Sequence, residues 1–189
     1  MTPDALTGGF IEPARQSARA FRAALAAMSR PGTIASVDGA TPPAPLSAAA
    51  GALILTLCDG TTPVHLGPAV DSEAVRDWIA FQTGAPFAAA EGASFAIGTW
   101  ADLAPLNRFA AGLPDYPDRS VTLIVEMPGL APEGARLTGP GIAGEARLTL
   151  PETAAFRHNR AQFPRGFDVF LTCGNRLAAV PRSTIVEDR

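Results

Sequence analysis

The sequence contains no lysine: all fifteen basic residues among its 189 are arginine. Without a side-chain amine the chain cannot form an internal Schiff base with an aldehyde cofactor, and it has no lysine for a phosphate-binding P-loop. Only two cysteines are present, Cys58 and Cys173, too few for a disulfide framework. These shortages exclude lysine-dependent cofactor chemistry and favour a reducing cytoplasm, and we expect no cofactor.

Long apolar runs are also missing. The longest covers residues 48–58, well short of the roughly 20 residues that span a bilayer. The start of the chain has no tripartite signal-peptide pattern. With 47% hydrophobic and 17% charged residues, the composition is that of a globular protein, and the length suits one domain. We therefore expect a single domain over residues 1–189, located in the cytoplasm, with no membrane partner.

Charge is distributed unevenly along the chain. Residues 59–133 carry three arginines against ten acidic residues, a net charge of −7, whereas residues 134–189 carry eight arginines against five acidic residues. The whole chain has a net charge of −3, which gives no reason to expect a nucleic-acid partner. The asymmetry allows electrostatic docking on a protein, or an anion pocket built by the last third of the chain.

Apolar periodicity and turn residues predict alternating helices and strands. Helices are expected at 13–28, 48–57, 71–82, 103–111 and 152–162, and strands at 33–37, 64–66, 93–98, 121–127, 167–173 and 177–180. In the helix at 71–82, Ala74, Trp78 and Phe81 are expected to face inward. This alternation predicts a single α/β domain with a mixed β-sheet covered by helices on both faces.

A glycine-rich segment, Gly139-Pro140-Gly141-Ile142-Ala143-Gly144, matches the G-x-G-x-x-G pattern of dinucleotide-binding loops. That chemistry needs a helix after the glycines, but the following residues alternate and stop at Pro151. The stretch Ala-Arg-Leu-Thr occurs on both sides of the segment, at 135–138 and 146–149. A β-hairpin is the favoured interpretation, with the glycines supplying positive φ angles.

Candidate binding residues lie in the last third of the chain. Arg157, His158, Arg160 and Arg182 suggest a pocket for a phosphate-like anion, because guanidinium forks match phosphate and phosphonate oxygens. A solvated helix face is the competing interpretation. His65 and His158 are the only histidines and neither has a neighbouring ligand, so we expect no metal site. No arrangement of residues indicates a catalytic site.

A second candidate site is a row of arginines on the first predicted helix. Arg15, Arg19, Arg22 and Arg30 lie on one side of it, and no acidic residue occurs between positions 14 and 30. Ala14, Ala18, Phe21, Leu25 and Met28 recur at helical spacing on another side. The arginines form either a solvated surface or a docking stripe for the acidic surface of another subunit or a second copy.

Three segments resemble the PhnH family, the H subunits of the bacterial carbon–phosphorus lyase system. The first comprises Gly9, Phe10, Pro13, Ser17, Phe21, Arg22 and residues 27–32; the second, residues 137–142; the third, Phe163, Pro164, Gly166 and residues 168–172 and 177–184, with Pro181 and Arg182. Their order and spacing cover nearly the whole chain. Arg165 and Phe167 depart from the family pattern, which has smaller or aliphatic residues there.

The resemblance implies a fold like a shortened large domain of pyridoxal-phosphate-dependent transferases. It also implies a homodimer that joins the G, I and J subunits in a core complex for phosphonate catabolism. That complex replaces the adenine of ATP with a phosphonate, which gives ribose 1-phosphonate 5-triphosphate. Family members have no assigned catalytic residues, so the implied role is a non-catalytic structural subunit. The alternative left open by the residues is a stand-alone α/β enzyme that binds a phosphorylated substrate through an arginine-lined pocket.

Overall fold

The structure, a computed structural model, describes residues 6–188. Its centre is a six-stranded sheet in the order β1-β8-β7-β4-β3-β2. Four adjacent strands are parallel: β2 (Val64–Leu66), β3 (Phe95–Thr99), β4 (Thr122–Glu126) and β7 (Asp168–Cys173). Strands β8 (Arg176–Val180) and β1 (Ala35–Ser36) complete the sheet in antiparallel pairing. The predicted single α/β domain with a mixed sheet is confirmed.

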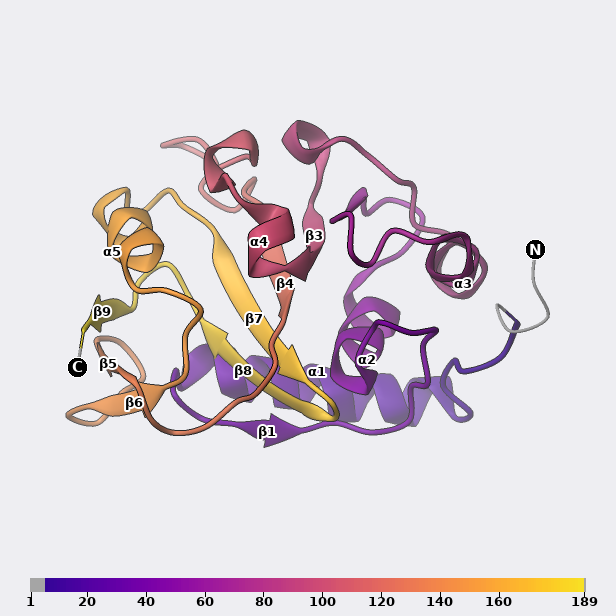
Figure 1. Cartoon of the computed structure of the whole chain (residues 1–189), viewed down its shortest axis with the longest axis horizontal. Coiled ribbons are helices and arrows are strands. Elements are labelled where there is room, and N and C mark those ends of the chain that lie inside the picture. The colour runs from indigo at the N-terminus through magenta and orange to yellow at the C-terminus, as the bar shows by residue number, and fades with distance from the viewer. Residues whose placement is uncertain (1–5, 189) are drawn as a thin grey trace.

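Helices α1 (Pro13–Ser29), α2 (Ala48–Leu57) and α3 (Glu73–Thr83) cover one face of this sheet. The other face is covered by α4 (Trp100–Leu103), α5 (Ala154–Ala161) and a small antiparallel sheet. The small sheet has the order β6-β5-β9, with β5 at Ala135–Thr138, β6 at Ala146–Leu148 and β9 at Ile185–Glu187. Figure 1 shows α5 and the small sheet on one side of the central strands and α2 and α3 on the other.

Local signals set the helix boundaries. Pro13 opens α1, where its missing N–H costs no hydrogen bond. The Ser47 side chain caps α2 by accepting a hydrogen bond from Ala50 N, and Ser72 caps α3 in the same way. Gly84 ends α3 at a φ of 70°, in the left-handed conformation that favours glycine. Polar caps and terminating glycines therefore place the helices close to their predicted positions.

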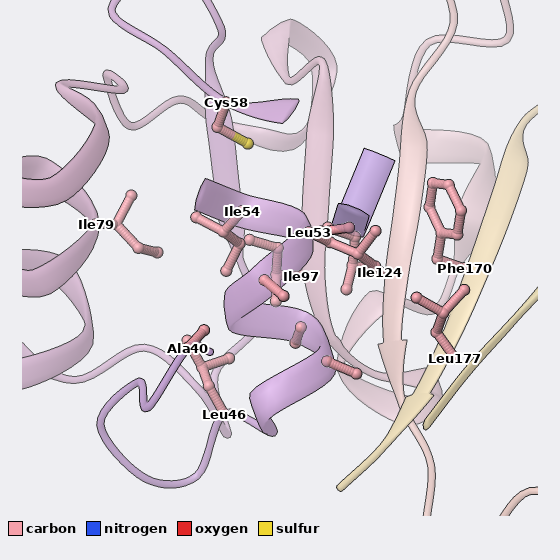
Figure 2. Close-up of a cluster of buried hydrophobic side chains, with 14 of the residues drawn as sticks. Ala40, Leu46, Leu53, Ile54, Cys58, Ile79, Ile97, Ile124, Phe170 and Leu177 are labelled. Carbon is pink, nitrogen blue, oxygen red and sulfur yellow. The ribbon is translucent and has the colours of Figure 1, made fainter. Parts of the chain in front are cut away.

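Each face of the central sheet packs into its own hydrophobic cluster. On the helical face, Leu53 and Ile54 of α2 lie between Ile79 of α3 and the sheet residues Ile97 and Ile124, as Figure 2 shows. On the other face, Leu123 and Val125 pack with Leu137 and Leu148 of the small sheet and Phe156 of α5. Strand β4 is apolar on both faces, as expected for a parallel strand buried between two layers.

Two predicted details are wrong. Trp78 is buried as predicted, but Phe81 is 52% exposed, because α3 buries Val75 and Ile79 beside Trp78. The predicted helix at 103–111 is also replaced. Helix α4 starts earlier, at Trp100, under a capping box between Thr99 and Asp102, and ends at Leu103 before Pro105; a single 3-10 turn follows at Leu106–Arg108.

Candidate interaction surface

Helix α1 has three distinct sides. Ala20, Ala24 and Ala27 are buried, and their small side chains let the helix pack closely on α2 and β8. The larger apolar residues point elsewhere: Phe21 is 50% exposed and Leu25 is 56% exposed. The third side carries arginines. The helix is therefore held to the core by alanines, while its large apolar side chains are left near solvent.

Phe21 and Leu25 border an apolar groove of about 200 Å³. Its floor is formed by the first residues of three parallel strands, Phe95, Thr122 and Asp168, which are paired in register. The remaining lining residues are Ala24, Met28, Leu57 and Phe170. Exposed apolar surface of this kind, rimmed by polar groups, marks interaction sites in folded proteins.

The predicted docking stripe lies on another side of α1 than Phe21 and Leu25. Arg15 makes a 3.5 Å ion pair with Glu12 on the surface. Arg19, Arg22 and Arg30 are also exposed, and among residues 6–188 no hydrogen bond or ion pair engages their side chains. Arg30 lies just beyond the end of α1, as its C-cap. The docking role of the four arginines stays a prediction. Arg19 does not line the apolar groove but borders a separate hollow of about 220 Å³ together with Ser36, Asp38 and Gly39.

The four residues predicted to bind an anion make separate contacts. Arg182 donates to Asp168 Oδ2 at 2.5 Å, to Pro117 O at 2.6 Å and to Ser120 Oγ at 2.5 Å. The Arg182 and Asp168 side chains are only 14% and 24% exposed. The guanidinium of Arg182 thus joins the loop before β4 to the start of β7, and its donors are already used.

The other three residues lie on α5. Arg157 pairs with Asp188 at 2.5 Å. Hydrogen bonding to Thr153, and then to Arg157, lowers the pKa of the Asp188 carboxyl. His158 is exposed and borders a hollow of about 170 Å³. Arg160 stacks on the Phe163 ring at 4.9 Å, and its buried Nε has no hydrogen-bond partner among the described residues. The anion pocket stays a prediction.

A buried carboxylate at the opposite, carboxyl edge of the sheet was not predicted. Thr99 and Glu126 end β3 and β4, and they pair in register with Thr172, the next-to-last residue of β7. Glu126 accepts hydrogen bonds from Ser47 N at 2.7 Å and from Thr172 Oγ1 at 3.1 Å. Burial raises the pKa of Glu126, while the hydrogen bonds from Ser47 and Thr172 oppose the shift. The signal for this site in the sequence was an acidic residue, Glu126, near the end of the most apolar predicted strand, 121–127.

The glycine-rich segment is the turn of the predicted hairpin. Strands β5 and β6 pair around it, and Gly139, Gly141 and Gly144 all have positive φ. A Cβ on Gly141 would lie 2.0 Å from the carbonyl oxygen of Ser29, and one on Gly139 would lie 3.3 Å from that of Ser183. The three segments that carry the family resemblance therefore meet at this turn, which serves packing and not a nucleotide.

The described residues 6–188 contain no group of three His, Cys, Asp or Glu side chains placed to hold a metal ion. Burial raises the pKa of the Cys58 thiol to about 12, so this cysteine stays protonated near neutral pH. In the same part of the chain, no helix has the length and apolarity needed to cross a membrane.

Comparisons with known proteins agree with the motifs. The sequence model of a family described as bacterial phosphonate metabolism protein (PhnH) matches residues 8–187. A relative from Rhizobium meliloti (strain 1021), the alpha-D-ribose 1-methylphosphonate 5-triphosphate synthase subunit PhnH, is 38% identical over 192 residues. The alignment covers 96% of this chain and 95% of the relative. With both matches spanning nearly its whole length, the chain belongs to the PhnH family of bacterial phosphonate metabolism proteins.

Proposed function

We propose that this protein is a non-catalytic structural subunit of the carbon–phosphorus lyase core complex in phosphonate catabolism. The complex forms ribose 1-phosphonate 5-triphosphate from ATP and a phosphonate, with release of adenine. The protein acts in the cytoplasm as a homodimer and binds the G, I and J subunits, and it has no nucleic-acid or membrane partner. The name of the 38% identical relative, a subunit of a synthase, supports membership of such a complex.

The observation that carries the proposal is the exposed side of α1. Phe21 and Leu25 leave about half of their surface in contact with solvent, and Arg19 and Arg22 have no partner in the described part of the chain. Covering exposed apolar side chains with another subunit lowers the free energy, and unpaired arginines favour a subunit that brings acidic groups to them. A subunit whose role is assembly requires such a surface.

Co-expression with the G, I and J subunits tests the proposal. A tag on one of these subunits should recover this chain in a fixed ratio after purification. The Leu25→Glu variant should be recovered less well, because it buries a carboxylate in the contact. Ile185→Glu serves as the matched control, since Ile185 is 42% exposed and lies on β9, in the small sheet on the other face of the molecule. Failure of the wild-type chain to co-purify with any of the three subunits would contradict the proposal.

The stand-alone enzyme has less support. It requires Arg157, His158, Arg160 and Arg182 to share one phosphorylated ligand. Arg157 instead holds Asp188, and Arg182 holds Asp168. Calorimetric titration with inorganic phosphate tests this alternative: binding that is lost in the His158→Ala variant would favour it.

A further inference from the structure

The central sheet has one open edge, at β1. Strand β1 pairs with β8 on one side, through Ala35↔Leu177 and Ser36↔Arg176, and within residues 6–188 no strand pairs with its other side. Figure 1 shows β1 at the lower rim of the molecule. An open edge offers unpaired backbone N–H and C=O groups to another chain, so most proteins cover or interrupt such edges.

The register shows which backbone groups of β1 face outward. Val37 N donates to Asn175 O at 2.8 Å. Opposite residues of an antiparallel pair alternate between hydrogen-bonded and non-hydrogen-bonded positions, so Ala35 and Val37 face β8, and the N–H and C=O of Ser36 point away from it. The N–H and C=O of Asp38 make no backbone hydrogen bond to any described residue. Ser36 and Asp38 are both exposed.

This chain covers the opposite edge of the same sheet. Beside β2, Val64 N donates to Pro86 O at 2.8 Å and Ala88 N donates to Val64 O at 2.9 Å. The segment at 86–88 therefore occupies the outer backbone groups of β2. In the described part of the chain no segment does the same for β1, so this edge stays available to a partner.

A hollow of about 220 Å³ follows the open edge on the side of α1. Residues 36–39 line it from the edge, and Gln16 and Arg19 line it from the helix. Asp38 accepts a hydrogen bond from Asn175 Nδ2 at 3.3 Å. Arg19 is exposed, and no hydrogen bond or ion pair holds its guanidinium among the described residues. The charged group that lacks a partner in this hollow is therefore basic.

We infer that the β1 edge binds an extended segment of a partner subunit by strand addition, and that an acidic side chain of this segment pairs with Arg19. In this kind of recognition, main-chain hydrogen bonds supply the affinity, and pockets for alternate side chains supply the specificity. The open edge provides the first and the hollow provides the second. The inference rests on the complex membership in the proposed function and names the surface that the complex uses.

A second copy of the chain fits this edge less well. Antiparallel pairing of β1 with β1 requires a two-fold axis perpendicular to the sheet, which keeps both α1 helices on the same face. The sides of α1 that carry Arg19 would then face each other, and like charges oppose this contact. We therefore assign the edge to a different subunit and not to the homodimer.

Hydrogen exchange of the intact complex tests the inference. The complex is purified after co-expression with the G, I and J subunits, and amide exchange is followed by mass spectrometry in the complex and in the chain alone. We expect the Ser36 and Asp38 amides to exchange at least about tenfold more slowly in the complex, because the added strand accepts their hydrogen bonds. The Val37 amide is the internal control, since Asn175 O binds it in both states.

Variants of the edge distinguish strand addition from simple covering. Ser36→Pro removes only a donor that points away from β8, so the pairing of β1 with β8 is kept. It should bind the complex at least about tenfold more weakly than Ser36→Ala, which keeps the N–H, because a carbonyl oxygen of the added strand loses its donor. Arg19→Glu should also weaken binding, through repulsion of the acidic side chain.

Arg165→Glu is the matched control for Arg19→Glu. Arg165 is also exposed, and its side chain makes no hydrogen bond or ion pair within the described structure. It precedes the start of β7, whereas Ser36 lies near the other end of β7, at the level of Cys173. This variant should be recovered with the complex as well as wild type. Unchanged melting temperatures for all four variants would show that loss of binding is not unfolding.

Each other outcome overturns the inference in a way that identifies the error. If the complex forms but the Ser36 and Asp38 amides exchange as they do in the chain alone, this edge is not the contact, while complex membership stands. If Ser36→Pro binds like Ser36→Ala, the backbone pairing is wrong, and if Arg19→Glu binds like wild type, the acidic partner is wrong. Protection of both amides in the chain alone would mean that a second copy covers the edge. If the chain co-purifies with none of the three subunits, the proposed function fails and the inference falls with it.

Discussion

Arg182 and the arginines of α1 carry the same charged group in opposite settings. The Arg182 side chain is 14% exposed and binds Asp168 together with Pro117 and Ser120, which lie on one loop about fifty residues before Asp168. Arg19 and Arg22 are exposed and have no partner among the described residues. We call the surroundings of Arg182 the closed region, because there the charged groups hold the fold together. We call the exposed side of α1 the open region, because its charged groups are available for association.

Replacing Arg182 should have the largest effect on stability. Arg182→Ala leaves the Asp168 carboxylate mostly buried with no counter-charge, and it removes the donors to Pro117 and Ser120. Breaking one side of a buried pair costs about 3–5 kcal/mol of unfolding free energy. Denaturant unfolding measures it. Arg22→Ala is the matched control from the open region; a similar loss in both variants would remove the distinction between the two regions.

The glycine turn next to Arg182 should be nearly as sensitive. A Cβ at Gly141 (φ +82°) would lie 2.0 Å from the Ser29 carbonyl oxygen, whereas Gly144 has a similar φ of +83° with nothing within 4 Å. Gly144→Ala should therefore lower the unfolding free energy only through backbone strain, by about 1 kcal/mol. Gly141→Ala must also displace the end of α1 and should cost more. Thermal unfolding should show a clearly lower melting temperature for Gly141→Ala. Equal melting temperatures would mean that α1 is not packed tightly on this turn.

The sequence predicted the helix starts and turns that depend on residues close together in the chain. Pro13, Ser47 and Ser72 begin helices where their chemistry requires, and the repeated Ala-Arg-Leu-Thr segments form the expected hairpin. Strand β9 was not predicted, because it pairs with β5 about fifty residues earlier. The partners of Arg182 were missed for the same physical reason: only tertiary structure brings Asp168 and Ser120 to it.

The open region was recognised only in part. The arginines and the larger apolar residues of α1 are visible as two helical stripes, but alanine is frequent enough that the sequence does not show which side is buried. The structure buries Ala20, Ala24 and Ala27 and leaves Phe21 and Leu25 half-exposed. The rest of the groove comes from residues much later in the chain, such as Leu57, Phe95 and Thr122, so helical periodicity could not reveal it.

The buried Glu126 provides a further test, in which burial of a carboxyl changes how the stability of the protein depends on pH. The expected effect is smaller than that of the Arg182 and Gly141 variants. Burial raises the pKa of Glu126 in the folded protein, so the folded state holds its proton to higher pH than the unfolded chain does. As pH rises from about 4.3, the unfolded value, through the raised pKa, wild type should lose stability relative to Glu126→Gln. Glutamine keeps an oxygen for Ser47 N, and its amide donates to Thr172 Oγ1, which itself donates to Val125 O.

The exposed Glu145 gives the opposite sign and serves as the control. Hydrogen bonding to Arg136 lowers the pKa of Glu145, so this carboxylate stabilises the fold above its unfolded pKa and loses that contribution as pH falls. Glu145→Gln should therefore become less stable relative to wild type as pH rises. Urea unfolding at several pH values measures both differences. If the stability difference from wild type changes with pH in the same direction for both variants, burial does not determine the pKa shift of Glu126.

The smallest effect on stability is expected from the open region itself. Replacing both Arg19 and Arg22 with alanine removes no hydrogen bond or ion pair within the described part of the chain, so the unfolding free energy of the subunit should change by no more than about 0.5 kcal/mol. The reference state matters, because a dimer gains apparent stability from its own concentration. Unfolding is therefore measured at several protein concentrations, with wild type and variant compared at the same concentration. A loss of several kcal/mol would mean that these arginines hold the fold as Arg182 does.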